Sequence, residues 1–186
     1  MPNYNRVVSH VVYPLALVNK RDKVIGKAEY EEIHSKGLLH RFVLVYVLDG
    51  RGKFFLQKRA STKPHGSLLA ESVCAHVRYG EDYLHTAKRR LKEELSIVKK
   101  DRDLIEITKS HVYTSKDKWK NNAFVKIYEC NISEKPVINK KEIQEGSFYH
   151  IEEVIKLFHE QPESFVPGFK TTFQLYLKGK NMRKSL

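Results

Sequence analysis

The sequence predicts an α/β (α+β) fold in which helices cover a mixed β-sheet, and three observations lead to this expectation. The run Phe42–Leu48 is apolar at every position, which is typical of a strand buried on both faces of a covered sheet. Asp49–Gly52 follows directly and is a strong hairpin signal before a second strand. Further along the chain, apolar residues recur at helical spacing, at Leu84, Ala87, Leu91 and Leu95.

The first part of the chain is expected to form strands and one short helix. Apolar and β-branched runs between turn residues mark the strands, and Gly37 is a fitting residue just past the helix end. Residues 59–70 show neither pattern and are expected to form a loop. The strands are expected at 11–18, 24–28, 42–48 and 53–58, and the helix at 29–35.

The last part of the chain is expected to add further strands and two helices. Pro162 ends a helix that begins at Ile151, and Pro167 is suited to the start of a last helix. A polar turn at 115–118 separates two longer strands. The strands are expected at 103–112, 122–131 and 147–150, and the last helix buries Phe169, Phe173, Tyr176 and Leu177 on one face.

Length and composition indicate one globular domain over residues 1–186, with a core at about 10–178 and a short basic C-terminal tail. The chain is 41% hydrophobic, and its longest apolar run, Phe42–Leu48, is far shorter than the ~20 residues that span a bilayer. Two cysteines far apart in sequence do not make a disulfide framework, so we expect a cytoplasmic protein. No membrane partner is expected, and the sequence does not specify an oligomeric state.

The net charge of +12 favours anionic partners, such as a phosphorylated metabolite, a nucleic acid or an acidic surface. The lysines are spread along the chain, and no nucleic-acid motif accompanies them. We therefore interpret most of them as a solubilising surface, and nucleic acid is not the expected partner.

The stretch from residue 71 to 97 carries the densest set of reactive side chains. Cys74 and His76 lie two apart on a short extended segment, before a turn and a charged helix. Arg90 and Glu94 are four residues apart beside the apolar stripe of that helix, so they point at the edge of the core. Such a pair can bind a metal or a phosphate, or form a plain salt bridge; Glu93 lies further round the helix.

This stretch resembles the Nudix box, G-x(5)-E-x(7)-R-E-U-x-E-E-x-G-U, where U is aliphatic. Ala75 and Ser96 replace glycines of the pattern, and Arg90 replaces a glutamate that commonly holds the metal in Nudix hydrolases. The positions of the pattern are occupied by Ala75, Glu81, Arg89, Arg90, Leu91, Glu93, Glu94, Ser96 and Ile97.

The pattern C-x-H, then GE, then RRLKxEL is more similar to the type 1 isopentenyl-diphosphate delta-isomerase branch of the Nudix superfamily. Residues 18–42 resemble the opening of that family, with V-I-G, a histidine and K-G-L-L-H-R. Residues 56–66 (LQKRASTKPHG) resemble its L-x-x-R-A-x-x-K-x-H-x-G segment, and Phe165–Phe169 a late segment that closes the active site. The resemblance implies a Nudix fold, an α/β/α sandwich.

The resemblance also implies a metal site. In the isomerases three histidines and two glutamates bind one divalent ion, and the histidines correspond to His34, His40 and His76, suited to Zn²⁺ or Mn²⁺. From spacing alone a structural role is favoured, with His40 and His76 as capping or core residues and His34 as a surface residue; with the resemblance, a metal site is favoured. The family's W-x-E-x-E is replaced here by Asn121 and Ala123, which removes both carboxylates.

The remaining implied site residues concern proton transfer and the diphosphate. Cys74 corresponds to the family's catalytic cysteine, although cysteine is also a common small core residue. Tyr30 stands where the family often has a lysine facing the diphosphate. The implied diphosphate contacts are Arg59, Lys63 and Arg90, and the implied ligands of Mg²⁺ (or Mn²⁺) are Glu94 and Glu93.

The sequence leaves three functions open. The first is an isomerase-type enzyme that handles isopentenyl, dimethylallyl or a similar diphosphate, with reduced activity because of Asn121 and Ala123. The second is a diverged Nudix hydrolase that cleaves a nucleoside- or prenyl-diphosphate bond, with Glu129 or Glu145 as candidate bases. The third is a non-catalytic protein that binds a phosphorylated ligand or RNA.

Overall fold

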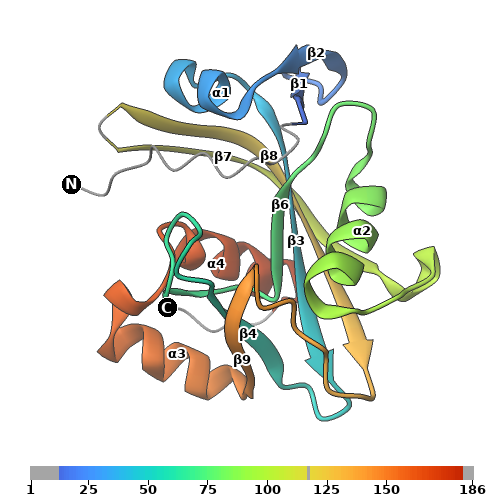
Figure 1. The fold of residues 1–186 in the computed structure, drawn as a ribbon, viewed down its shortest axis with the longest axis vertical. Coiled ribbons are helices and arrows are strands. Elements are labelled where there is room, and N and C mark those ends of the chain that lie inside the picture. Colours follow the sequence, from blue (N-terminus) through green and yellow to red (C-terminus); the bar gives the residue numbers. More distant parts are fainter. Residues whose placement is uncertain (1–12, 117, 182–186) are drawn as a thin grey trace.

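The computed structural model describes residues 13–116 and 118–181. Within these residues nine strands form one sheet. Four α-helices pack around it (Figure 1). The strands are β1 Leu15–Val18, β2 Val24–Ala28, β3 His40–Asp49, β4 Phe54–Arg59, β5 Leu69–Ala70, β6 Val73–His76, β7 Ile105–Lys116, β8 Trp119–Ile132 and β9 Ile143–Tyr149. The helices are α1 Tyr30–Lys36, α2 Tyr83–Leu95, α3 Ile151–Glu160 and α4 Phe169–Gly179.

Strand β3 lies at the centre of the sheet, as its apolar run predicts. It pairs with β8 in parallel along its whole length and with β6 in the antiparallel sense. Its alternate side chains enter two separate cores: Leu44 and Tyr46 pack on the side of α3 and α4, and Val43 and Val45 on the side of α2. Figure 1 shows α2 on one side of these strands and α3 and α4 on the other, which confirms the α/β/α arrangement.

Helix α1 and the hairpin of β1 and β2 close the upper end of the sheet (Figure 1). The helix ends at Gly37, whose φ of 68° is left-handed and whose backbone N–H donates to Ile33 O, as predicted for a residue past a helix end. A Cβ at this position would also lie 3.0 Å from the Lys120 side chain on β8. Gly37 therefore lets α1 approach β8 closely, which sets the position of His34.

Several predicted boundaries are corrected by the structure. The expected loop at 59–70 ends in β5, which pairs with β4, and β9 begins four residues before the predicted strand at 147. Strands β7 and β8 form one long hairpin, so Asn121 lies inside a strand rather than before one. The last helix begins at Phe169, two residues after Pro167. Residues 11–12 of the first predicted strand and the tail beyond 181 lie outside the described residues.

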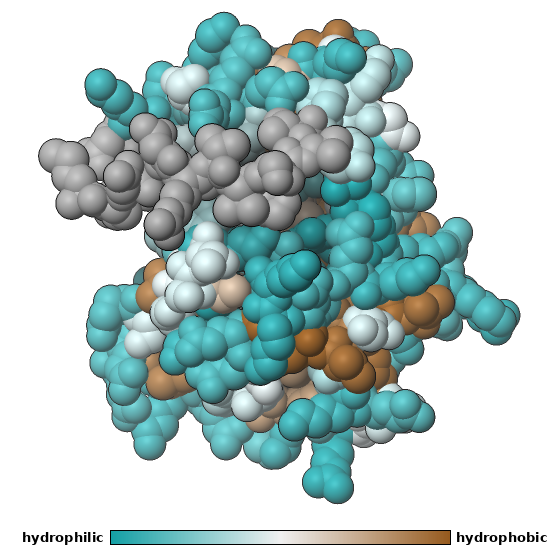
Figure 2. Space-filling model, viewed as in Figure 1, coloured by the Kyte–Doolittle hydropathy of each residue, from teal (hydrophilic) through white to brown (hydrophobic). Residues whose placement is uncertain are grey.

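The surface agrees with the lysine-rich composition. Figure 2 shows one face of the molecule as mostly hydrophilic, with hydrophobic residues gathered in its lower half. Among the residues that the structure describes, no helix is both long and apolar enough to cross a membrane.

Candidate functional site

Three histidines from three different elements meet on the face of the sheet that α4 also covers. His40 on β3 pairs in register with Ala123 on β8, and His76 on β6 pairs with Phe42. Because paired residues share a face, these side chains point the same way, and α1 adds His34. One ring nitrogen from each of the three histidines lies within 4.8 Å of the other two.

Backbone carbonyls determine which nitrogens of this cluster are free. The Nδ1 atom of His34 lies 3.0 Å from Lys120 O, and Nδ1 of His40 lies 3.0 Å from Leu38 O. Each Nδ1 must donate to its carbonyl, so each Nε2 of a neutral ring carries a lone pair. Nε2 of His34 lies 3.0 Å from Nε2 of His76, and the buried Nε2 of His40 has no hydrogen-bond partner among the described residues. In its other tautomer His76 would also present a lone pair at Nε2, and three ring nitrogens within 4.8 Å of one another are an arrangement that a cation fits.

Burial keeps the three rings neutral. It lowers the pKa of His34, lowers that of His76 well below its usual value, and lowers that of His40 to about 4. Neutral imidazole is the form that binds a metal ion. The amide oxygen of Asn121 is also buried without a partner among the described residues, whereas Ala123 offers no ligand atom. Three imidazoles and an amide suit Zn²⁺ or Mn²⁺ better than Mg²⁺.

Aromatic rings hold the histidines in place. The ring of Trp119 stacks on His34 with the centroids 4.4 Å apart, and Tyr30 contacts His34 and His76 edge-on at 4.6 and 5.1 Å. Tyr30 stands where the isomerases often have lysine, so an uncharged aromatic ring lines this side of the site in place of a positive charge. A cavity of about 280 Å³ is lined by Tyr13, Leu15, Tyr30, Ala75, His76, Arg78, Arg89 and Arg90, so it joins the histidines to the arginines of α2.

Cys74 lies on β6, two residues before His76 and on the same face. The Nη1 atom of Arg59 donates to its sulfur at 3.6 Å. Burial raises the pKa of the thiol to about 12, against the effect of Arg59 and with that of Glu71. The group is therefore a protonated thiol at neutral pH.

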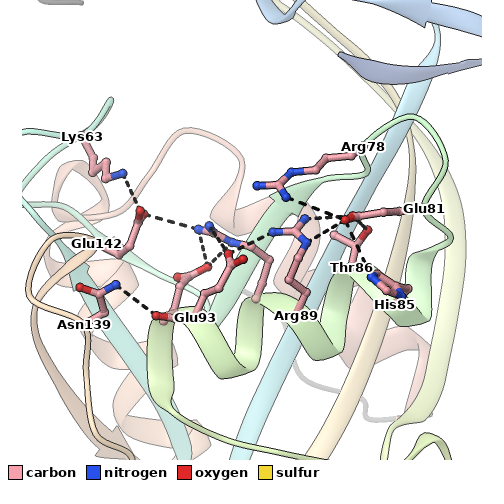
Figure 3. A network of polar contacts seen from close by, with 11 residues as sticks. Lys63, Arg78, Glu81, His85, Thr86, Arg89, Glu93, Asn139 and Glu142 are labelled. Carbon is pink, nitrogen blue, oxygen red and sulfur yellow. Dashed lines mark hydrogen bonds and ion pairs between the residues drawn. The ribbon is translucent and has the colours of Figure 1, made fainter. Parts of the chain in front are cut away.

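The second part of the site is a network of charged side chains along α2 (Figure 3). Arg90 lies 2.7 Å from Glu94, 3.2 Å from Glu93 and 3.4 Å from Glu142. The Glu94 side chain is 3% exposed and also accepts from Gln57, whereas Glu93 is 40% exposed, as the helical wheel predicts. Burial raises the pKa of Glu94, and Arg90 opposes this effect.

Glu142 is the functional candidate that the sequence did not reveal. It precedes β9 in a loop without a motif, and Figure 3 shows it between Lys63 and the end of α2. Lys63 lies 2.7 Å from its carboxylate, and Lys63 with Arg90 lowers the pKa of Glu142 in spite of its burial. The backbone N–H of Ala60, the residue after β4, donates to Glu142 O and joins this loop to the end of β4. No sequence pattern marks Glu142 as a site residue, and only its contacts with Lys63 and Arg90 in the folded chain identify it.

Glu129 and Glu145, the two carboxylates named as candidate bases, contact residues outside the charged network. Glu129 accepts from Tyr176 and lies 3.2 Å from Lys180, and Glu145 is 63% exposed beside Lys58. Glu81 accepts from both Thr86 and Arg89, so it supports the turn before α2. Among the glutamates named from the sequence, only Glu93 and Glu94 contact Arg90.

The family follows from a comparison with known proteins. A family model described as NUDIX domain matches residues 38–169, which include the central sheet, α2 and the charged network. The chain belongs to the Nudix family. Within the Nudix domain, Ser96 takes the place of a glycine of the box and has a left-handed backbone conformation, with φ of 57°.

Curated relatives support the isomerase-like branch. The chain is 32% identical to isopentenyl-diphosphate Delta-isomerase 2 of Photorhabdus laumondii over 84% of this chain and 88% of that protein. It is 31% identical to an uncharacterized Nudix hydrolase of Nostoc over 76% of this chain and 83% of that protein. A crystal structure from Deinococcus radiodurans shares the fold, with a TM-score of 0.71, 19% identity, and coverage of 92% of this chain and 99% of that one. The Nudix fold predicted from the sequence is confirmed.

Proposed function

We propose that this Nudix enzyme is of the isopentenyl-diphosphate isomerase type and handles isopentenyl diphosphate, or a similar diphosphate, with a divalent metal. One observation carries the proposal: Arg59 contacts the thiol of Cys74. A group suited to a phosphate and a group suited to proton transfer therefore adjoin each other. A small substrate with a diphosphate head and an unsaturated tail would reach both.

The diphosphate end consists of Arg59, Lys63 and Arg90. Arg90 and Lys63 both contact Glu142, each at a different oxygen, so one carboxylate joins the two cations. Glu94 and Glu93 would hold Mg²⁺ or Mn²⁺ beside them, because hard oxygen ligands suit these ions. When bound, such an ion neutralises the diphosphate charge and links it to the protein. The arginine forks orient the remaining phosphate oxygens.

The other end has Cys74 as proton donor and the histidines as a second cation site. His34, His40 and His76, with the amide of Asn121, would hold Zn²⁺ or Mn²⁺ without a carboxylate. Moving a double bond needs one group that gives a proton and another that takes one. Ala123 cannot take a proton, which is why we expect slow turnover.

Hydrolysis is the second candidate, and Glu142 is the observation that favours it. Glu93, Glu94 and Glu142 all contact Arg90, so three carboxylates surround the position where the Nudix box has a glutamate. Carboxylates of this kind can hold metal ions and activate water. Arg90 neutralises the same carboxylates, and this neutralisation weakens the case for efficient hydrolysis.

The test is proton and phosphorus NMR of isopentenyl diphosphate with the protein, Mg²⁺ and Mn²⁺ in deuterated buffer. Dimethylallyl diphosphate, or deuterium in the substrate, supports isomerisation. Release of phosphate or monophosphate moves the protein to the hydrolases. An unchanged substrate with measurable binding rejects both reactions for this diphosphate.

Two cysteine variants give a matched control. Cys74→Ser removes the thiol beside Arg59 and is expected to abolish isomerisation. Cys130→Ser changes the other cysteine, which is buried on the α2 side of the sheet, and is expected to leave the rate unchanged. Equal rates for the two variants would contradict the role proposed for Cys74.

A further inference from the structure

Arg78 lines the cavity between the histidines and α2, and the proposed function gives it no role. It lies two residues after the end of β6, where the chain turns towards α2. Its backbone forms an antiparallel bridge with Leu15, and the N–H of Tyr79 donates to Pro14 O at 2.8 Å. This pairing brings Tyr13, two residues before Leu15, to the side chain of Arg78.

The ring of Tyr13 covers the flat face of the Arg78 guanidinium, whose Cζ atom lies 3.8 Å from the ring centroid. Stacking of this kind fixes the plane of a guanidinium group and leaves the N–H groups in that plane open to another partner. A side chain that is already fixed loses less entropy when it binds a ligand. The stack therefore prepares Arg78 to bind an anion in the cavity.

The three arginines of the cavity differ in how far their charge is neutralised. Arg89 lies 2.8 Å from Glu81 and 3.0 Å from Glu93. Arg90 contacts three carboxylates at 2.7–3.4 Å. Within the described part of the chain, Arg78 has one ion pair, with Glu81 at 4.0 Å, which is too long for a hydrogen bond. The N–H groups of Arg78 are therefore the most available to a bound anion.

Shared carboxylate oxygens join Arg78 to the rest of the network. Oε1 of Glu81 lies 4.0 Å from Nη1 of Arg78 and 2.8 Å from Nε of Arg89. Oε2 of Glu93 lies 3.0 Å from Arg89 and 3.2 Å from Arg90. Figure 3 shows the side chain of Arg78 reaching over α2 towards Arg89. The positive lining of the cavity thus continues from Arg90 to Arg78.

On the basis of the proposed function, we propose that Arg78 is a further phosphate-binding residue of the diphosphate site and that Tyr13 is its positioning residue. The in-plane N–H groups of Arg78 donate to oxygens of the diphosphate from the side of β1, and Arg90 binds it from α2. A diphosphate carries its charge on several oxygens, so planar guanidinium groups from two directions bind it more tightly than one.

The experiment compares Arg78→Gln with Arg102→Gln in the full chain. Arg102 is the matched control, because it also has one ion pair at 4.0 Å, with Asp103, and is 79% exposed outside the cavity. Calorimetric titration with inorganic diphosphate and Mg²⁺ measures the affinity. We expect it to fall at least about tenfold in Arg78→Gln, as for the loss of a charge-assisted hydrogen bond, and to stay at the wild-type value in Arg102→Gln. Wild-type affinity in Arg78→Gln, or equal losses in both variants, overturns the proposal.

Two variants of Tyr13 test the stack. Tyr13→Phe keeps the ring and is expected to bind inorganic diphosphate as the wild type does. Tyr13→Leu removes the ring face and is expected to lower the affinity about threefold, the size of one exposed cation–π contact. In an Arg78→Gln background, Tyr13→Leu should cause no additional loss, because the ring acts through the guanidinium. A full additional loss would overturn the positioning role of Tyr13.

Binding of inorganic diphosphate does not depend on turnover, so the role of Arg78 is separable from the proposed reaction. If the wild type binds inorganic diphosphate but does not act on isopentenyl diphosphate, the proposed function fails and the affinity of Arg78→Gln alone decides on Arg78. A wild type that does not bind inorganic diphosphate overturns the role of Arg78. Where isopentenyl diphosphate is turned over, Arg78→Gln should raise KM about tenfold with kcat nearly unchanged, because the contact is the same in ground state and transition state. An unchanged KM would contradict this role.

Discussion

The histidine cluster and the arginine network of α2 lie at two sides of one cavity, and they differ in how their charge is arranged. The cluster contains His34, His40 and His76, all held neutral by burial. The network pairs Arg89, Arg90 and Lys63 with several carboxylates at 2.7–3.4 Å. The histidine cluster is buried and uncharged, and the arginine network is dense in opposite charges.

This difference indicates that the two parts depend on different interactions. The network is complete by itself, because every buried charge has a partner. In the cluster, Nε2 of His40 and the amide oxygen of Asn121 have no partner among the described residues, and the three ligand candidates include no carboxylate. The network should therefore tolerate the absence of a ligand, whereas the cluster should respond to a metal ion.

Breaking the network is expected to have the largest effect. Arg90→Met leaves the carboxylate of Glu94 buried with only Gln57 as partner, so the free energy of unfolding should fall by about 3 kcal/mol. Urea denaturation measures this loss. Lys36→Met is the control, because it removes an exposed pair with Glu32 that contributes less than about 1 kcal/mol. Similar losses for both variants would show that the network is a surface feature.

The cluster is expected to respond to acid. The pKa of His40 is about 4 in the folded chain against a usual value of 6.5, so between these pH values the unfolded chain binds more protons. Stability should then decrease as the pH falls from 6.5 to 4, by up to about 3 kcal/mol for His40. His40→Gln, which can still donate to Leu38 O, should flatten this decrease in denaturation curves. A variant with the wild-type pH dependence would rule out His40 as the cause.

Adding charge to the cluster sharpens the comparison. Asn121→Glu with Ala123→Glu supplies the two carboxylates that the isomerase pattern has, so affinity for Mn²⁺ or Zn²⁺ should rise at least about tenfold, or 1.4 kcal/mol. Calorimetric titration measures this change. The double variant with glutamine at both positions is the matched neutral control and should show no such gain. Equal affinities for the two double variants would mean that these positions do not face the ion.

The smallest effect concerns the helix that carries the network. Ser96 has φ of 57°, a conformation that costs a residue with a Cβ about 1 kcal/mol, so Ser96→Gly should stabilise the chain by roughly that amount. Gly37→Ser makes the reverse change at the end of α1, where a Cβ would also crowd Lys120. It should destabilise the chain, as thermal unfolding can show. Destabilisation by Ser96→Gly would indicate that the serine hydroxyl contributes more than the backbone strain.

Much of the fold was predictable because its patterns are local. The alternation of Val43, Leu44, Val45 and Tyr46 into two cores follows from a run that is apolar at every position. The pairing of Arg90 with Glu94, and the greater exposure of Glu93, follow from helical spacing alone. The family resemblance indicated that His34, His40 and His76, which lie far apart in sequence, belong to one site. The length of the hairpin of β7 and β8 was underestimated, because its polar strand ends carry no apolar signal.

The sequence by itself determined the helices, the central strand and the reactive residues within the stretch from 71 to 97. Only the tertiary structure decided that His34, His40 and His76 share one point, because this depends on the register of β3 with β6 and β8. It also brought Glu142 to Arg90 and Thr172 to Glu71. Both contacts join residues far apart in sequence through loop and helix packing, and a periodic pattern in the chain contains no information about such distances.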